Sequence, residues 1–286
     1  MDKPKVALMY DFDGTLSPDN MHEYDFMKAI RVEDKNLFWD ETHQLAECQQ
    51  ASTILSYMKL MIDKAKAGGV SIRRQQFVEF GKSIDLFPGV EQWFDMINRQ
   101  GEEMGVCVEH YIISSGLKEL IEGTSIARHF KKIYACSFMY ENDEAVWPAV
   151  AVDFTSKTQF IFMINKGIYD IWDNARINDS MPDETRPIPF QNMIYLGDGE
   201  TDLPSMRIVK SEGGHSFAIY KPGVDGSRAQ ARNLVKRGRV NFACPGDYTE
   251  GSELHRAVLA TIAKIKTDSE FRAAESINQR KMRVNP

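Results

Sequence analysis

The 286-residue sequence has few cysteines and histidines, and neither residue type occurs at a spacing typical of a metal site. Its four cysteines lie far apart and form no C-x-x-C pair, which predicts reduced core side chains rather than disulfides. Its six histidines show neither H-x-H nor H-E-x-x-H spacing, so a histidine zinc site has no support. We expect His22 and His43 to be polar surface residues.

Long apolar runs and an excess of basic residues are also missing. No stretch approaches the roughly 18 apolar residues that span a bilayer. The start of the sequence is apolar only briefly before two carboxylates, unlike a signal peptide, so we expect a cytoplasmic protein without a membrane partner. The net charge of −6 argues against a nucleic-acid partner. A basic run between Arg228 and Arg239 lacks interleaved aromatic residues and predicts a solvated face.

What the sequence does contain is an alternation of short apolar runs and amphipathic stretches. Runs at residues 6–10, 106–113, 193–196 and 217–219 predict buried strands, and residues 133–140 and 145–153 predict a hairpin. Helices are expected from Pro88-Gly89 to Gly101, at residues 158–164, from about residue 203, and at 254–262. This order predicts an α/β fold with a Rossmann-like, mainly parallel sheet and helices on both faces. The polar tail after Lys266 is expected to be peripheral.

The stretch after the first strand is different in character and predicts a helical insert at about residues 21–85. Apolar residues spaced by three and four run from Leu45 to Ile62, which predicts one amphipathic helix that ends at Gly68-Gly69. Ser71 is expected to cap the next helix. The chain is therefore divided into an α/β core, residues 1–18 and 86–286, and a helical cap, residues 19–85.

Charged and polar side chains follow the predicted strands at the points where they end. Asp11 and Asp13 follow the first strand, and Asp198 and Asp202 follow the strand at 193–196. In an open α/β sheet, ligands gather at this edge. Four carboxylates against the single cation of Lys157 require a counter-ion or proton uptake, and oxygen ligands favour Mg²⁺. Ser114 ends another apolar run, where a hydroxyl and free amides at a helix start would bind phosphate.

Four motifs in chain order resemble those of the haloacid dehalogenase (HAD) superfamily phosphatases, nearest to their phosphoserine phosphatase-like branch. They are DFDGT at residues 11–15, YIISS at 111–115, SKTQF at 156–160 and LGDGETD at 196–202. The resemblance covers most of residues 5–220. The family carries a helical cap between its first and second motifs, where the insert is predicted here. The resemblance implies a hydrolase that uses Mg²⁺ and acts on a small phosphorylated metabolite.

The resemblance also implies a role for each matching acid. Asp11 would be the nucleophile that forms an aspartyl-phosphate. Asp13 would be the general acid and base, a residue that the dehalogenases of the superfamily lack and that P-type ATPases replace by threonine. Mg²⁺ would bind Asp11, the backbone carbonyl of Asp13, and Asp198.

The remaining matches would bind the phosphoryl group. Ser114 and Lys157 would contact its oxygens as catalytic residues, together with the amides of Ser115 and Gly116. Asp202 would orient either the metal ligands or Lys157.

Substrate choice is expected to lie in the cap. In phosphoserine phosphatases a glutamate seven positions after the second aspartate binds the substrate ammonium, and this sequence has Asn20 there. Asp19 and Glu23 are near but out of register, and Arg73 or Arg74 could contact a substrate carboxylate or phosphate. We expect a small phosphomonoester, either phosphoserine or another amino- or hydroxy-substituted metabolite. A phosphotransferase and a non-catalytic binding module are the alternatives.

Overall fold

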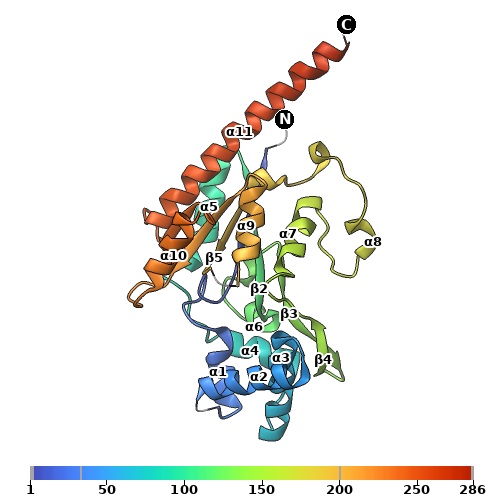
Figure 1. Ribbon diagram of the computed structural model, residues 1–286, viewed down its shortest axis with the longest axis vertical. Helices are drawn as coiled ribbons and strands as arrows, with labels where there is room; N and C mark the ends of the chain where they lie inside the picture. The colour runs from blue at the N-terminus through green and yellow to red at the C-terminus, as the bar shows by residue number, and fades with distance from the viewer. Residues whose placement is uncertain (1–2, 33, 200, 285–286) are drawn as a thin grey trace.

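The computed structural model describes residues 3–32, 34–199 and 201–284 and is built around a seven-stranded sheet (Figure 1). The strand order is β4-β3-β2-β1-β5-β6-β7, and all neighbours are parallel except the β3-β4 hairpin. The strands are β1 Lys5–Tyr10, β2 Cys107–Leu117, β3 Lys132–Glu141, β4 Glu144–Val150, β5 Met193–Gly197, β6 His215–Tyr220 and β7 Phe242–Pro245. The predicted Rossmann-like α/β fold is confirmed.

Continuous apolar runs form the central strands because both faces of the sheet are covered. All residues of β1 after Lys5, and all of β5, are buried. Helix α5 packs against β2 and α11, and α9 packs against β5, β6 and α7, so that helices flank the sheet (Figure 1). The helices after the insert are α5 Val90–Glu103, α6 Lys118–Glu122, η2 Ala127–His129, α7 Lys157–Lys166, α8 Asn174–Ile177, η3 Asp183–Thr185, η4 Phe190–Asn192, α9 Leu203–Ser211, α10 Ser227–Lys236 and α11 Glu253–Val284.

The segment between β1 and α5 is helical, as the sequence predicts, and its helices gather at one end of the molecule (Figure 1). They are η1 Met21–Glu23, α1 Asp25–Ala29, α2 Lys35–Gln49, α3 Thr53–Gly68 and α4 Arg74–Gly81. The single amphipathic helix expected through Leu45 and Ile62 is wrong. Gln50 takes a left-handed conformation with φ +50° and ends α2, so that the apolar face is divided between two packed helices.

Several smaller expectations are corrected by local packing. Helix α5 continues past Gly101 to Glu103. Gly101 is buried, and a Cβ there would lie 2.7 Å from Val108 Cγ2, so this glycine allows close packing instead of ending the helix. The cap position of α4 is Arg73 rather than Ser71, although the Ser71 hydroxyl accepts a hydrogen bond from the Arg73 amide at 3.4 Å. The predicted hairpin is confirmed, with Asn142 and Asp143 at positive φ in its turn. Strand β7 and helix α10 were not predicted.

Two further features concern the surface. Cys136 and Cys244 are buried free thiols, but Cys48 and Cys107 are exposed, so the expectation that all cysteines belong to the core is wrong. The tail after Lys266 is the second half of α11, which extends beyond the rest of the molecule (Figure 1). In the described ranges, no helix has both the length and the apolar character that crossing a bilayer requires.

Candidate active site

Asp11 lies directly after β1, at the carboxyl edge of the sheet, with 5% of its surface exposed. Its amide donates to the Leu196 carbonyl of β5 at 2.9 Å. The chain then turns sharply, because the Phe12 carbonyl accepts three successive amides from residues 15–17. Gly14 has φ +70°, and a Cβ there would lie 2.8 Å from Asp198 Oδ2. The turn after β1 therefore lies against the loop after β5.

Lys157 is the first residue of α7 and is completely buried. Its Nζ lies 3.0 Å from Asp11 Oδ1 and donates to Asp202 Oδ1 at 2.7 Å. The Tyr195 hydroxyl donates to the same Asp202 oxygen at 2.7 Å. A Cβ at Gly197 would lie 2.3 Å from Asp202 Oδ2, so only glycine leaves room for this carboxylate. A buried ammonium held by two carboxylates fixes the position of all three groups.

The electrostatics of these groups are strongly coupled. Burial raises the pKa of Asp11 well above its usual range, and the neighbouring Asp202 raises it further while Lys157 opposes the shift. Burial alone would lower the pKa of Lys157, but Asp11 and Asp202 outweigh it and keep the amine protonated. Asp13 has its pKa raised to about 7, chiefly by burial and also by the charges of Asp198 and Glu23.

Three of the predicted acids come together as a possible metal site. Carboxylate oxygens of Asp11, Asp198 and Asp202 all lie within 4.8 Å of one another. Asp202 Oδ2 is buried and has no hydrogen-bond partner within the described part of the chain. A buried carboxylate oxygen left in this state is costly, and an all-oxygen donor set suits a hard divalent cation. These residues therefore fit Mg²⁺.

This grouping differs from the set expected from the sequence, which had Asp13 as the third ligand and Asp202 outside it. The side chain of Asp13 is turned toward the helical segment, where its Oδ1 accepts the Met21 amide at 2.8 Å. Only its backbone carbonyl was expected to bind the metal, and that expectation stays a prediction. Glu200 of the fourth motif lies outside the described residues.

Ser114 lies on β2, the neighbour of β1, and is almost fully buried at the same edge of the sheet. Its Oγ accepts the Gly116 amide at 3.0 Å. The helix start expected at Ser115 and Gly116 is wrong, because β2 continues to Leu117 with a register irregularity and α6 begins only at Lys118. Ser115 is held by its carbonyl, which accepts the Tyr57 hydroxyl at 2.8 Å.

The family model of haloacid dehalogenase-like hydrolases matches residues 8–207 of this chain. The chain belongs to that family. An uncharacterized protein from Borreliella burgdorferi is 30% identical over 285 residues, which cover 90% of this chain and 96% of that protein.

Solved structures of other HAD hydrolases share the fold. A probable phosphoserine phosphatase from Vibrio cholerae is 14% identical with a TM-score of 0.56, over 94% of this chain and 67% of that one. A phosphoserine phosphatase solved as a phospho-aspartyl intermediate analogue is 13% identical with a TM-score of 0.52, over 90% and 98%. A HAD family hydrolase from Salmonella enterica serovar Typhi is 16% identical with a TM-score of 0.53, over 84% and 67%.

The expected specificity residues of this HAD hydrolase do not form one group. Asn20 caps η1, where its Oδ1 accepts the His22 amide at 3.0 Å. Glu23 accepts the Lys35 ammonium at 2.7 Å. The backbone of Arg73 instead forms a single antiparallel β-bridge with Glu144, at the turn of the β3-β4 hairpin. Asn20 and Glu23 are thus joined through η1 to Asp13, while Arg73 belongs to another part of the surface.

His22 was expected on the surface, and this is wrong. The residue is 2% exposed, and its ring packs edge-on against Tyr57 and Trp39, with ring centroids 5.1 and 6.2 Å away. Its Nδ1 lies 2.9 Å from Asn20 Oδ1, an acceptor, so Nδ1 carries the proton. Nε2 is then a buried acceptor, and it has no partner among the described residues. Burial lowers the pKa of His22 to about 3, so the ring is neutral.

Three supporting residues were missed by sequence reasoning. Tyr195 looks like one more apolar residue of β5, and Met21 and Tyr57 look like ordinary packing residues of the insert. A hydroxyl inside an otherwise apolar strand was the only available signal, since buried hydroxyls usually find a partner. The partners themselves depend on the fold and cannot be read from spacing.

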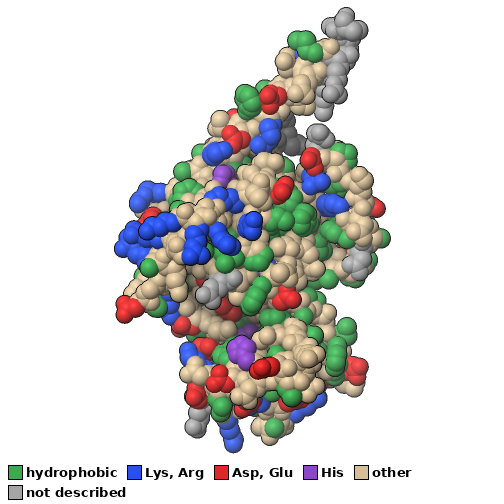
Figure 2. Space-filling model, viewed as in Figure 1, with side chains coloured by type: hydrophobic (Ala, Val, Ile, Leu, Met, Phe, Trp, Pro, Cys, Tyr) green, Lys and Arg blue, Asp and Glu red, His purple; other side chains and the backbone are tan. Residues whose placement is uncertain are grey.

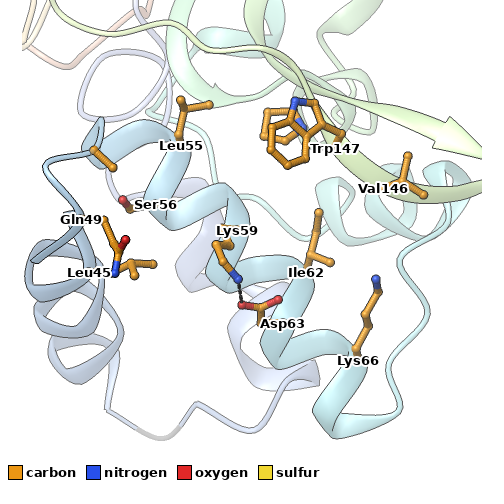
Figure 3. Close-up of a pocket in the computed structure, with 12 residues that line it drawn as sticks. Leu45, Gln49, Leu55, Ser56, Lys59, Ile62, Asp63, Lys66, Val146 and Trp147 are labelled. Atoms are coloured by element: carbon orange, nitrogen blue, oxygen red, sulfur yellow. Dashed lines mark hydrogen bonds and ion pairs between the residues drawn. The ribbon is translucent and has the colours of Figure 1, made fainter.

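A separate groove of about 600 Å³ lies between α2, α3 and β4, and neither Asp11, Asp198 nor Asp202 lines it. Figure 3 shows Leu55, Ile62 and Trp147 around it, with an ion pair between Lys59 and Asp63 along α3. None of the residues predicted to act in catalysis lines this groove. Its position on the helical segment and the hairpin separates it from the candidate active site.

Proposed function

We propose that this HAD hydrolase is a Mg²⁺-dependent phosphatase that cleaves a small phosphomonoester through an aspartyl-phosphate on Asp11. The observation that carries the proposal is the contact of Asp11 with the buried Lys157, which Asp202 holds in place. Asp13, two residues further on, supplies a carboxyl group whose pKa of about 7 suits proton transfer near neutral pH. The solved phosphoserine phosphatases of the same fold support this reading.

The first half of the reaction transfers the phosphoryl group to the enzyme. A carboxylate oxygen of Asp11 attacks phosphorus, and the bond from phosphorus to the ester oxygen breaks. Asp13 in its protonated form donates its proton to that oxygen, so that the product leaves as a neutral alcohol. Lys157 keeps its charge throughout because its raised pKa prevents it from losing a proton.

The second half returns the enzyme to its starting state. Asp13, now a carboxylate, accepts a proton from a water molecule that attacks phosphorus. The bond between phosphorus and the Asp11 oxygen breaks, and inorganic phosphate leaves. Each residue ends the cycle with the proton count it had at the start.

Several groups would stabilise the charge on the phosphoryl oxygens. Lys157 lies at the Asp11 carboxylate and contributes a fixed positive charge. The Ser114 hydroxyl accepts the Gly116 amide, so its own proton can be donated to a phosphoryl oxygen. The amides of Ser115 and Gly116 are less suited than the sequence suggested, because the Gly116 amide is already bonded.

Asp11, Asp198 and the backbone carbonyl of Asp13 would hold Mg²⁺, with Asp202 either as a further ligand or as the anchor of Lys157. A bound Mg²⁺ supplies positive charge that neutralises the carboxylates and the phosphoryl oxygens. This role follows from the donor set, since the described acids far outnumber the cations at this edge.

Residues 19–85 would form the cap and residues 1–18 and 86–286 the core, with substrate enclosed between them. His22 follows Met21, whose amide donates to Asp13, and His22 Nε2 has no partner among the described residues, which favours a leaving group that carries a hydroxyl or an ammonium. Asn20 is occupied by His22 and replaces the carboxylate expected for phosphoserine. The substrate would therefore be a small amino- or hydroxy-substituted phosphoester.

The experiment is a phosphate-release screen over phosphorylated metabolites, with Mg²⁺ or with EDTA. The wild-type protein should release phosphate from at least one small ester only with Mg²⁺. Asp11→Asn should abolish release while the protein stays folded, and Asp63→Asn, an exposed acid on α3, should behave as wild type. Added alcohols would reveal transfer if the enzyme is a phosphotransferase. Full activity of Asp11→Asn would remove the proposed mechanism.

A further inference from the structure

Three arginines from two distant parts of the chain line a small pocket. The pocket has a volume of about 310 Å³ and is lined by Arg207, Arg237, Gly238 and Arg239. Arg207 lies on α9, and the other three residues form the turn after α10. All three arginines are exposed, and the described part of the chain offers them no carboxylate within ion-pair distance. We call this feature the arginine pocket.

The arginine pocket belongs to a strongly basic region of an acidic protein. Residues 207–239 contain eight Lys and Arg against two Asp and Glu, although the whole chain has a net charge of −6. Figure 2 shows Lys and Arg side chains gathered on the face of the molecule where α9 and α10 lie. Exposed like charges repel one another, so their concentration here is unfavourable unless an anion binds.

The pocket is held in shape by backbone contacts. Gly238 has φ +69°, and the amides of Gly238 and Arg239 donate to the Val235 and Leu234 carbonyls, both at 2.9 Å, which closes the end of α10. Lys210 Nζ on α9 donates to the Gly238 and Val240 carbonyls at 2.7 and 2.9 Å. The turn is therefore fastened to α9, which brings Arg207 to the two arginines of the turn.

A simpler explanation covers only part of this arrangement. Basic residues near a helix C-terminus are stabilised by the helix dipole, and Arg237 and Arg239 lie at the end of α10. Arg207 belongs to another helix and gains nothing from that dipole. Its position at the same pocket requires a different reason.

We propose that the arginine pocket binds the phosphate groups of a soluble anion of about diphosphate size. Guanidinium groups form paired hydrogen bonds with phosphate oxygens, and three of them match the charge of a diphosphate. The volume lies at the small end of the range for ligand pockets. This site is distinct from the candidate active site, because residues 237–239 precede β7 at the amino edge of the sheet while the aspartates lie at its carboxyl edge.

The test is calorimetric titration of the full-length protein with inorganic pyrophosphate in EDTA. Without a divalent cation the clustered aspartates repel anions, so binding reports on the arginine pocket alone. Wild-type protein should bind one pyrophosphate. Arg207→Gln and Arg239→Gln should each weaken binding by roughly 10-fold or more, as expected for a lost charge-assisted hydrogen bond. Arg228→Gln, an exposed arginine of α10 outside the pocket, should change it by less than about 2-fold.

Three outcomes would overturn the proposal. Pyrophosphate could fail to bind, or Arg228→Gln could weaken binding as much as Arg239→Gln, which would indicate only diffuse attraction. The protein could also bind vesicles of anionic phospholipid but not pyrophosphate, which would assign the surface to a membrane. Thermal unfolding of each variant checks that it is folded, and phosphate release from a substrate found in the screen should stay at the wild-type rate in both pocket variants.

Discussion

The carboxyl edge of the sheet and the helices between β1 and α5 hold their polar side chains in different ways. At the sheet edge, Asp11, Lys157 and Asp202 are buried and contact one another, so that each depends on the others. In the helices, Asn20 and Glu23 are bonded to near neighbours in their own segment. In the first arrangement, charged groups from distant parts of the chain shift one another's pKa. The second mainly positions local structure, and among the described residues of these helices it leaves His22 Nε2 and Ser56 Oγ buried without a partner.

The largest expected effect on rate, after loss of Asp11 itself, comes from the neighbouring acid. Asp13→Asn should lower kcat by about 10²- to 10⁴-fold, because no proton donor remains for the leaving oxygen. The measurement is steady-state phosphate release with Mg²⁺. Asp19→Asn, a nearby exposed acid paired with Lys221, is the matched control and should stay within about 3-fold of wild type. Equal losses in both variants would contradict a specific role for Asp13.

The buried ammonium should matter for stability as well as for rate. Lys157→Met should lower the free energy of unfolding by about 3–5 kcal/mol in EDTA, because two buried carboxylates lose their partner. Denaturant titration measures the change. Lys59→Met, which breaks an exposed ion pair on α3, should cost less than about 1 kcal/mol. A loss below 1 kcal/mol for Lys157→Met would show that the sheet-edge charges are not coupled as described.

The acidic cluster should also impose a pH dependence on the metal-free protein. Asp13 has a folded-state pKa of about 7, above its usual value of 3.8, so the folded state holds the proton more tightly than the unfolded state. Stability from this group is complete below about pH 4 and is lost as pH rises through about 7. Urea titrations in EDTA should show this fall, and Asp13→Asn should make it smaller. An unchanged slope in the variant would assign the pH dependence to other groups.

The smallest expected effect is that of replacing Arg73, in contrast to replacing His22 in the same helical segment. Arg73→Ala should leave kcat/KM within about 2-fold, since Arg73 is exposed and lies at the hairpin turn beside Glu144. His22→Phe should instead reduce the preference for a substrate with a hydroxyl or ammonium over an analogue with a methyl group. The measurement is the ratio of kcat/KM for such a pair. A larger change for Arg73→Ala than for His22→Phe would reverse this assignment.

The same comparison explains how much could be predicted from the sequence. Apolar runs that stop at Asp11, Ser114 and Asp198 predicted the strands and the edge of the sheet that carries the site, because a strand end and a polar residue coincide in the chain. The contact of Tyr195 with Asp202 could not be predicted, because it depends on Asp202 lying back against β5, where only a glycine at position 197 leaves room for its carboxylate. Spacing alone gave no sign of it.

The helical segment was harder to predict for a physical reason. Periodic apolar residues continue across Gln50, but a left-handed residue there ends one helix and lets the next fold back onto it. His22 was misjudged because its burial depends on Trp39 and Tyr57, which come from two later helices. The arginine pocket likewise joins Arg207 to a turn 30 residues later, and only the fold brings them together.

The most direct test of the central claim is the mass of the peptide that contains Asp11 after the reaction is stopped in acid. Protein incubated with Mg²⁺ and acetyl phosphate, a small reactive phosphate donor, should carry one phosphoryl group on residue 11, and borohydride should convert that residue to homoserine. Protein in EDTA should carry none. A phosphoryl group on any other residue, or full turnover with residue 11 never modified, would contradict the account.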